Sequence, residues 1–313
     1  MENISNNKVE NKKDYPPLTL FPESSKITLE QIREKMGNDK KIIVCDFYVD
    51  QIDSIGGSKV EPFGLVVENI INIDHHAPIG SMERQVSSAT LAIEFVKREG
   101  VLPDAETVIN HTDCDSVLSS SIIRGMLPPE ERFSDAAIAA DHTGEPNEIA
   151  DLLQALQEKR DVGYSLHHLS QLLGNAPIDE EVQKLVNKRL HEREEAKGLV
   201  ENGMFKTIGK VAYAETEAKF DGSFLPALLP ESWVIILSYP YKENGAIVPY
   251  QYETKIRLGK NVPAGFTLQQ LKLGETAIHW GGRWNAGSNK RAGGSTLSAE
   301  ECANIIAEKL EKL

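Results

Sequence analysis

The sequence lacks long hydrophobic runs, paired cysteines and an excess of positive charge. No window approaches the roughly 18 to 20 consecutive apolar residues of a membrane span, and the polar N-terminus has no apolar core resembling a secretory signal. Cys45, Cys114 and Cys302 have neither pairing nor CxxC spacing, which argues against a disulfide framework or a structural zinc site and fits a cytoplasmic location. The net charge of −13 disfavours a broad phosphate-binding surface, so we expect neither a membrane nor a long nucleic-acid duplex as partner.

The chain has 313 residues, enough for about two domains. Residues 1–25 are expected to form a flexible N-terminal lead-in. Between residues 26 and 202, strand-like apolar runs alternate with helical patterns, which predicts an α/β domain on a parallel sheet with flanking helices and a charged connecting helix. Between residues 203 and 313, alternating strands precede one closing helix, which predicts a smaller α+β C-terminal domain for substrate binding.

Two apolar runs in the first part are typical of buried strands. "KIIVCDF" is one, and "GLVVENIINIDHH" is predicted to be a single second strand that ends at the triplet 74–76. The segment "SSATLAIEFVKREG" predicts a helix that Ser87 or Ser88 caps and Gly100 closes.

Acidic and histidine side chains gather in four clusters at the ends of the predicted elements. The clusters are Asp46; Asp74, His75 and His76; His111, Asp113 and Asp115; and Asp141 with His142. Ligands of open parallel sheets bind beyond the carboxyl ends of the strands, so we expect these side chains to converge. Carboxylates with neutral imidazoles suit Mn²⁺, Fe²⁺, Zn²⁺ or Mg²⁺, and could hold two ions about 3.5 to 4 Å apart. A cap or turn role explains one such acid, but not four clusters at corresponding positions.

These clusters resemble the motifs of the DHH phosphoesterase family. "NIDHH" resembles the triplet that names the family, "VCD" the preceding strand-end aspartate, "NHTDCDSVLSS" the His…Asp-x-Asp-Ser motif and "AADHTGE" the final aspartate motif. The resemblance covers residues 40 to 145 and extends weakly to the C-terminal part. Two features differ from the family. The His…Asp-x-Asp motif follows the triplet, as in a circular permutation, and one residue instead of three separates His111 from Asp113.

The resemblance implies two metal sites that share Asp46 as a bridging ligand. The other ligands would be Asp113 with His111 on one ion, and Asp115, His75 and Asp141 on the other. His76 would face the substrate as general acid or phosphate contact, and Asp74 would orient a histidine. A hydroxide that bridges the ions would attack phosphorus in line. The shortened spacing leaves open whether His111 is a ligand.

A glycine-rich stretch near the end, "HWGGRWNAGSNKRAGGS", is the second concentrated signal. Glycines let backbone N–H groups approach a phosphate, and arginine offers it a bidentate fork. Ser288 stands where a Walker A loop requires lysine, so the stretch is not such a loop. It resembles the Gly-rich loop of the family's C-terminal domain, which predicts a substrate-binding set of Gly281, Gly282, Arg283, Asn285, Lys290 and Arg291. The alternative is a flexible surface hairpin, and Trp280 and Trp284 either stack on a base or pack inside the small domain.

These patterns predict a cytoplasmic phosphohydrolase that depends on two divalent ions, with Mn²⁺ expected and Mg²⁺ or another divalent ion as the alternative. Its substrate would be a small phosphorylated molecule such as a nucleotide or a short oligonucleotide. A second hypothesis is a catalytically degenerate, nucleotide-binding sensor on the same fold, because the permuted order and the shortened spacing also fit a protein that no longer hydrolyses.

Overall fold

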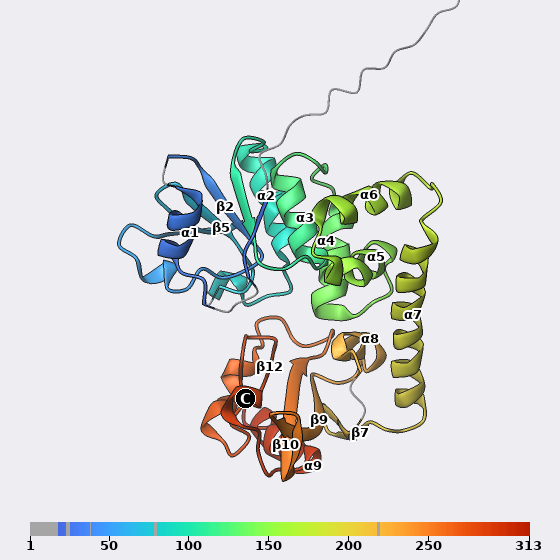
Figure 1. Cartoon of the computed structure of the whole chain (residues 1–313). Helices are drawn as coiled ribbons and strands as arrows, with labels where there is room; N and C mark the ends of the chain where they lie inside the picture. The colour runs from blue at the N-terminus through green and yellow to red at the C-terminus, as the bar shows by residue number, and fades with distance from the viewer. Residues whose placement is uncertain (1–17, 23–25, 38, 78–79, 218–219) are drawn as a thin grey trace, which may run out of the picture.

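Two domains lie one above the other and are joined along one side by the long helix α7 (Glu180–Glu201) (Figure 1). The structure is a computed structural model and describes residues 18–22, 26–37, 39–77, 80–217 and 220–313. Each domain is built on a six-stranded sheet within the described residues, which confirms the predicted two-domain α/β class. None of the helices in these ranges combines the length and the apolar character that crossing a membrane requires.

The N-terminal sheet is parallel in its centre and antiparallel at one edge. Its order is β1-β6-β2-β5-β4-β3, and the parallel strands are β1 (Leu18–Leu20), β6 (Glu106–Ile109), β2 (Ile42–Cys45) and β5 (Ile70–Ile73). The antiparallel strands are β4 (Gly64–Val67) and β3 (Lys59–Glu61). The run predicted as one strand is therefore the hairpin β4–β5, which turns at Glu68 with a left-handed φ of 52°. Both strands are mostly buried, so their apolar pattern does not reveal the turn.

The edge strand β1 lies inside the stretch that was predicted to be a flexible lead-in. Residues 18–20 pair in parallel with residues 107–109 of β6, and the Phe21 N–H donates to the Ile109 carbonyl at 2.8 Å. Phe21 is itself buried in the core. A short apolar segment of this kind forms a strand only because a sheet edge is present to pair with it. Residues 1–17 and 23–25 of the predicted lead-in lie outside the described part of the chain.

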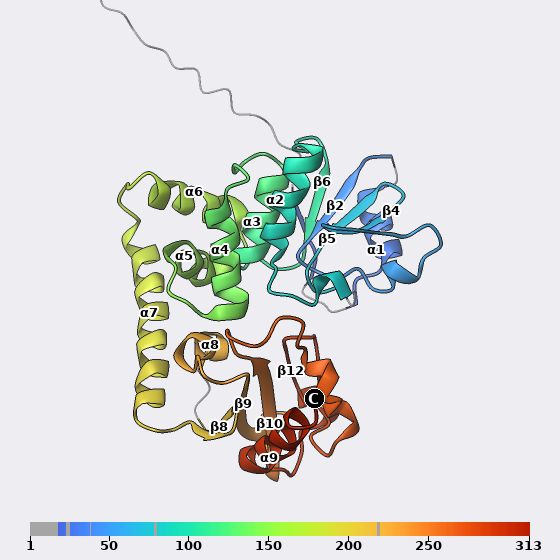
Figure 2. The same cartoon turned by 180° about the vertical axis from the view of Figure 1, so that it is seen from behind.

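Helices pack on one side of the parallel strands, with α2 and α3 against the sheet and α5 and α6 farther from it (Figures 1 and 2). The helices of this group are α2 (Ser88–Glu99), α3 (Cys114–Ile123), α4 (Glu131–Ile138), α5 (Glu148–Leu156) and α6 (Val162–Leu173), and α1 (Leu29–Met36) lies apart from them. The side chain of Ser87, one of the two predicted caps, accepts the Thr90 N–H at the start of α2, and Gly100 closes the helix. After α4 the chain continues as one π-helical turn, Ala139–Thr143.

The C-terminal sheet has the order β11-β12-β10-β9-β8-β7. Its strands are β7 (Lys206–Ile208), β8 (Val211–Glu215), β9 (Val234–Glu243), β10 (Ala246–Leu258), β11 (Gly281–Gly282) and β12 (Ala286–Ser288). The closing helix α9 (Ala299–Leu310) packs against β8 and β9, and the short helix α8 (Leu225–Leu228) lies next to the N-terminal domain. Trp280 and Trp284 are buried in the core of this domain, so the structure favours packing over base stacking for both.

Candidate metal centre

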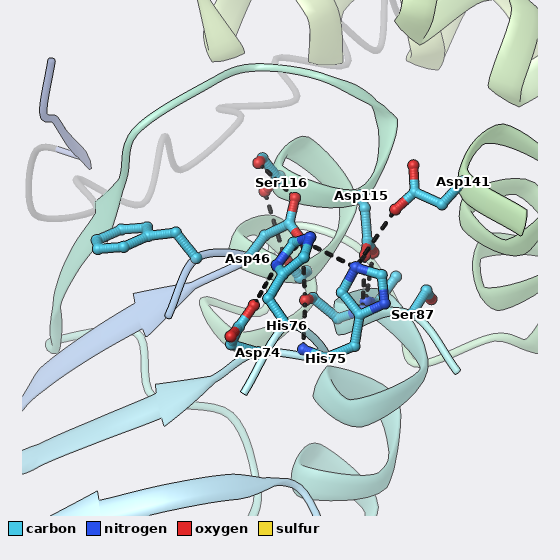
Figure 3. Close-up of polar contacts among 12 residues, drawn as sticks. Asp46, Asp74, His75, His76, Ser87, Asp115, Ser116 and Asp141 are labelled. Carbon is cyan, nitrogen blue, oxygen red and sulfur yellow. Dashed lines mark hydrogen bonds and ion pairs between the residues drawn. The ribbon is translucent and has the colours of Figure 1, made fainter. Parts of the chain in front are cut away.

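The four acid and histidine clusters meet where the parallel strands end. Asp46 follows β2 and the triplet 74–76 follows β5. Residues 110–113 link β6 to α3, Asp115 lies in the first turn of α3, and Asp141 lies in the π-helical turn. Figure 3 shows the side chains of Asp46, His75, Asp115 and Asp141 pointing toward one another. His75 Nε2 lies 3.7, 3.6 and 3.4 Å from carboxylate oxygens of the three aspartates in that order. The convergence expected from the parallel sheet is present.

His75 is held in the form that binds a cation. Its Nδ1 lies 2.7 Å from the Val86 carbonyl, which can only accept, so Nδ1 carries the hydrogen and Nε2 keeps its lone pair. Nε2 is buried and has no hydrogen-bond partner in the structure. Burial lowers the pKa of His75 well below its usual range, and the nearby His142 and Arg283 add to this effect. A neutral, unpartnered imidazole nitrogen that faces three carboxylates fits a divalent metal ion.

The carboxylates around His75 also fit a cation. Burial, followed by repulsion from neighbouring carboxylates, raises the pKa of Asp46, Asp115 and Asp141. Both oxygens of Asp115 nevertheless accept hydrogen bonds of 2.6 Å, from the backbone N–H groups of Ser88 and Ala89 in the first turn of α2. The protein therefore fixes the position of this carboxylate without neutralising the cluster, and a bound ion would supply the missing charge.

A second group of ligands surrounds His111. His111 Nε2 lies 3.0 Å from Asp46 Oδ2 and 3.3 Å from Asp113 Oδ2, so the shortened spacing does not keep it from the centre. Asp113 caps α3 by accepting the Ser116 N–H, which places its carboxylate at the start of the helix. Burial opposes the charged form of His111, but Asp113 and Asp46 dominate and raise its pKa to about 12. A metal ion bound here would take the place of this proton.

Asp46 belongs to both groups. Its Oδ1 lies toward His75 and its Oδ2 toward His111, which is the arrangement that a bridging ligand needs. Two serines hold it: the hydroxyl of Ser88 donates to Oδ1 at 2.9 Å, and the hydroxyl of Ser116 donates to Oδ2 at 2.7 Å. Asp46 also has a left-handed φ of 60°, a strained conformation that is common at functional sites. From the sequence, Ser88 was expected only as a possible helix cap, and Ser116 had no predicted role, although it lies in the His…Asp-x-Asp-Ser motif.

His76 and Asp74 form a pair beside the candidate metal ligands. His76 Nδ1 lies 2.5 Å from Asp74 Oδ1, and His76 lines the large cleft described below. Burial raises the pKa of Asp74 to about 8, although Arg283 opposes the shift. In the structure Asp74 contacts His76, and its role in orienting a histidine stays a prediction.

A cleft of about 970 Å³ lies between the C-terminal domain and one side of this centre, which Asp46, His76 and His111 form. Of the predicted substrate-binding residues, Gly281, Gly282, Arg283 and Arg291 line it. Two others, Asn285 and Lys290, are not among the residues that line the cleft. Asn285 is buried in the turn before β12 and faces His142. Lys290 is exposed at the start of a short 3-10 helix, Lys290–Ala292, and the next residue of that helix, Arg291, lines the cleft.

Further cleft residues were missed because no motif marks them. Lys255 and Arg257 line the cleft from β10, two positions apart and therefore on the same face of the strand. His279, with a left-handed φ of 54°, adds an imidazole. Alternating cations in "ETKIRLG" were the available signal, but an exposed edge strand commonly shows the same pattern.

No family model and no curated protein matches the chain. Among solved structures, the chain is similar to the pGpG-specific phosphodiesterase PggH from Vibrio cholerae. The two are 11% identical with a TM-score of 0.46, and the match covers 72% of this chain and 96% of PggH. An exopolyphosphatase-related protein from Bacteroides fragilis has 14% identity, a TM-score of 0.38, and coverage of 91% and 75%. The exonuclease RecJ bound to manganese has 12% identity, a TM-score of 0.38, and coverage of 91% and 79%. These neighbours are phosphoesterases of the DHH family. The likeness is weak in each case, so the function of this chain has to be inferred from its own residues.

Proposed function

We propose that the protein is a divalent-metal-dependent phosphohydrolase acting on a small phosphorylated molecule such as a nucleotide or a short oligonucleotide. One observation carries the proposal: Asp46, His76 and His111, at one side of the candidate metal centre, line the same cleft as four cationic side chains. The four are Lys255, Arg257, Arg283 and Arg291. Most of a chain with a net charge of −13 repels a phosphate ester, so a local concentration of cations marks where the anion binds. A cleft of about 970 Å³ suits a small ligand and not a long duplex.

Two metal ions, Mn²⁺ in the first instance, would be held by the two ligand groups that share Asp46. One group is Asp46, His111 and Asp113; the other is His75, Asp115 and Asp141, with Asp46 between them. When bound, such ions polarise a phosphoryl oxygen and lower the pKa of water. Ser88 and Ser116 keep the Asp46 carboxylate turned toward both groups, so the ligands are arranged before any ion arrives.

His76 and Arg283 would act on the substrate itself. The pairing of His76 Nδ1 with Asp74 leaves Nε2 as the ring atom available to the cleft, where it would donate a proton to the leaving-group oxygen or bind a phosphoryl oxygen. Arg283 lies in the opposite wall, and its charge is close enough to oppose the burial that raises the pKa of Asp74. Its guanidinium would bind two phosphate oxygens at once and bring the ester against the metal ligands.

The test is turnover of a panel of phosphorylated metabolites and short oligonucleotides by protein reconstituted with Mn²⁺. Asp46→Ala should abolish most metal-dependent phosphate release without unfolding the chain. Asp104→Ala is the matched control, because Asp104 is exposed before β6, at the opposite end of that strand from the centre. Full turnover by Asp46→Ala would refute the proposal. Tight nucleotide binding with one ion or none and no phosphate release would instead favour the sensor.

A further inference from the structure

The π-helical turn that carries Asp141 is the place where the C-terminal domain touches the candidate metal centre. Three contacts reach it from the C-terminal domain. Arg257 donates to the Asp141 carbonyl at 3.4 Å, Asn285 Nδ2 lies 3.1 Å from His142 Nδ1, and the rings of Trp284 and His142 stack with centroids 5.7 Å apart. π-helical turns are rare and are often found at functional sites.

The chain just after this turn packs against the other domain without spare room. Gly144 has a left-handed φ of 68°, and a Cβ atom there would lie 2.3 Å from the Ser223 carbonyl oxygen and 2.8 Å from Phe224 Cα. Ser223 and Phe224 of the C-terminal domain thus lie directly against the backbone of Gly144. Any side chain at this position would push the two domains apart. The position of Asp141 is therefore tied to the position of the C-terminal domain.

His142 continues the connection to His75 through one carbonyl group. The Val86 carbonyl accepts from His75 Nδ1 at 2.7 Å and from His142 Nε2 at 3.0 Å. Because a carbonyl only accepts, His142 must carry its hydrogen on Nε2, and its Nδ1 is left to accept from the Asn285 amide. Asn285, His142, Val86 and His75 form a continuous hydrogen-bonded series from the C-terminal domain to a candidate metal ligand.

We propose that the docked C-terminal domain sets the affinity of the ion held by His75, Asp115 and Asp141, with Asn285 and His142 as its positioning residues. The proposal rests on the proposed function only in requiring that the centre binds metal. The other ligand group, Asp46 with His111 and Asp113, receives none of the contacts described above, so its ion should not depend on them. Residues that orient metal-bound histidines typically change metal affinity by about 10- to 100-fold when they are mutated.

The experiment measures Mn²⁺ binding to the full chain by calorimetry and by electron paramagnetic resonance, with no substrate present. Asn285→Ala should weaken one of two bound ions by at least about tenfold and leave the other unchanged. The control is Asn261→Ala, because the exposed Asn261 bonds only the Pro230 carbonyl in the hydrogen bonds described, inside the C-terminal domain. An Asn285→Ala protein that binds both ions like the wild type would overturn the inference. A wild-type protein that binds no ion would instead overturn the proposed function.

A double-mutant cycle tells which ion responds. In an Asp113→Ala background only the His75 group remains intact, and adding Asn285→Ala should reproduce the full loss of affinity. In an Asp141→Ala background the same addition should have no effect on the remaining ion. An equal loss in both backgrounds would mean a general disturbance of the fold and would overturn the inference.

His142 provides a second pair of variants in case Asn285→Ala folds poorly. His142→Gln keeps an N–H donor for the Val86 carbonyl and an acceptor for the Asn285 amide, whereas His142→Ala removes both. We expect His142→Gln to bind both ions within about threefold of the wild type, and His142→Ala to lose the same ion as Asn285→Ala. Equal binding by His142→Ala and the wild type would also overturn the inference.

Discussion

The hydroxyl of Ser116 donates a hydrogen bond of 2.7 Å to Asp46 Oδ2, although 70 positions separate the two residues in the chain. Both are buried, and Oδ2 is the oxygen that faces His111. Ser116→Ala should therefore leave the fold intact but free the Asp46 carboxylate to rotate. We expect the affinity for Mn²⁺ to fall by about tenfold, measured by calorimetry.

Ser120→Ala is the matched control for Ser116→Ala. Ser120 is buried one turn further along α3, and its hydroxyl bonds the Ser116 carbonyl instead of Asp46. Its removal should change stability alone. Equal losses of metal affinity in the two variants would contradict the role given to the Ser116 hydroxyl.

The cation that matters most for substrate binding should be Arg283. It faces the cleft from the hairpin β11–β12, whereas Lys290, in the same glycine-rich stretch, is exposed and does not line the cleft. Hydrogen bonds to charged groups contribute about 1.5 to 3 kcal/mol, so Arg283→Ala should raise KM for the best phosphorylated substrate by about 10- to 100-fold. Lys290→Ala should change it less than twofold. Steady-state kinetics would contradict this assignment if the two variants behaved alike.

The candidate site could be predicted from the sequence where its residues come directly after a strand of the parallel sheet. Asp46, the triplet 74–76 and residues 111–115 each follow a strand of the parallel sheet, and parallel strands deliver such residues to one edge. The glycine-rich stretch was identified by composition, but composition does not tell which way consecutive side chains point. Arg291 lines the cleft and its neighbour Lys290 does not, and composition alone could not distinguish the two.

Other features depend on contacts that no short segment encodes. The hairpin β4–β5 looks like one strand because both halves are buried, and β1 exists only through its pairing with β6. Lys255 and Arg257 reach the cleft only through the relative position of the two domains. The contact of Asn285 with His142, 143 positions earlier, likewise forms only because the two domains meet there.

His76 should be required for turnover but not for holding the ions. It lines the cleft, and its Nδ1 lies 2.5 Å from Asp74 Oδ1 but 3.8 Å from Asp46 Oδ1. Asp46, His75 and His76 form a third possible ligand group, but the two proposed groups do not need His76. General acid catalysis typically contributes about 10²- to 10⁴-fold, so His76→Ala should lower kcat within that range. Calorimetry should still find two Mn²⁺ ions per chain. Loss of an ion in this variant would make His76 a ligand and not a proton donor.

The stability of the metal-free protein should fall as the pH rises. Burial raises the pKa of Asp115, Asp141 and Asp74 above that of an unfolded aspartate, about 4, so the folded state binds more protons than the unfolded state. Stability from these groups is complete below about pH 4 and is lost as the pH rises through the folded values, to about 8 for Asp74. The pKa of His111, raised to about 12, acts in the same direction above its unfolded value of about 6.5. The lowered pKa values of Asp113, His75 and His142 act in the opposite direction, the two histidines only up to about pH 6.5.

Mn²⁺ should reverse this loss, because it binds the ionised carboxylates and displaces their protons. Each ion at 100 times its Kd adds about 2.7 kcal/mol to the free energy of unfolding. The difference in Tm between protein with excess Mn²⁺ and protein with a chelator should therefore be larger at pH 7.5 than at pH 5.5. Asp74→Asn should flatten the decline of the metal-free protein, since it removes one titrating group. A Tm difference that is equal at both pH values, or larger at pH 5.5, would show that the buried acids are not what the ions neutralise.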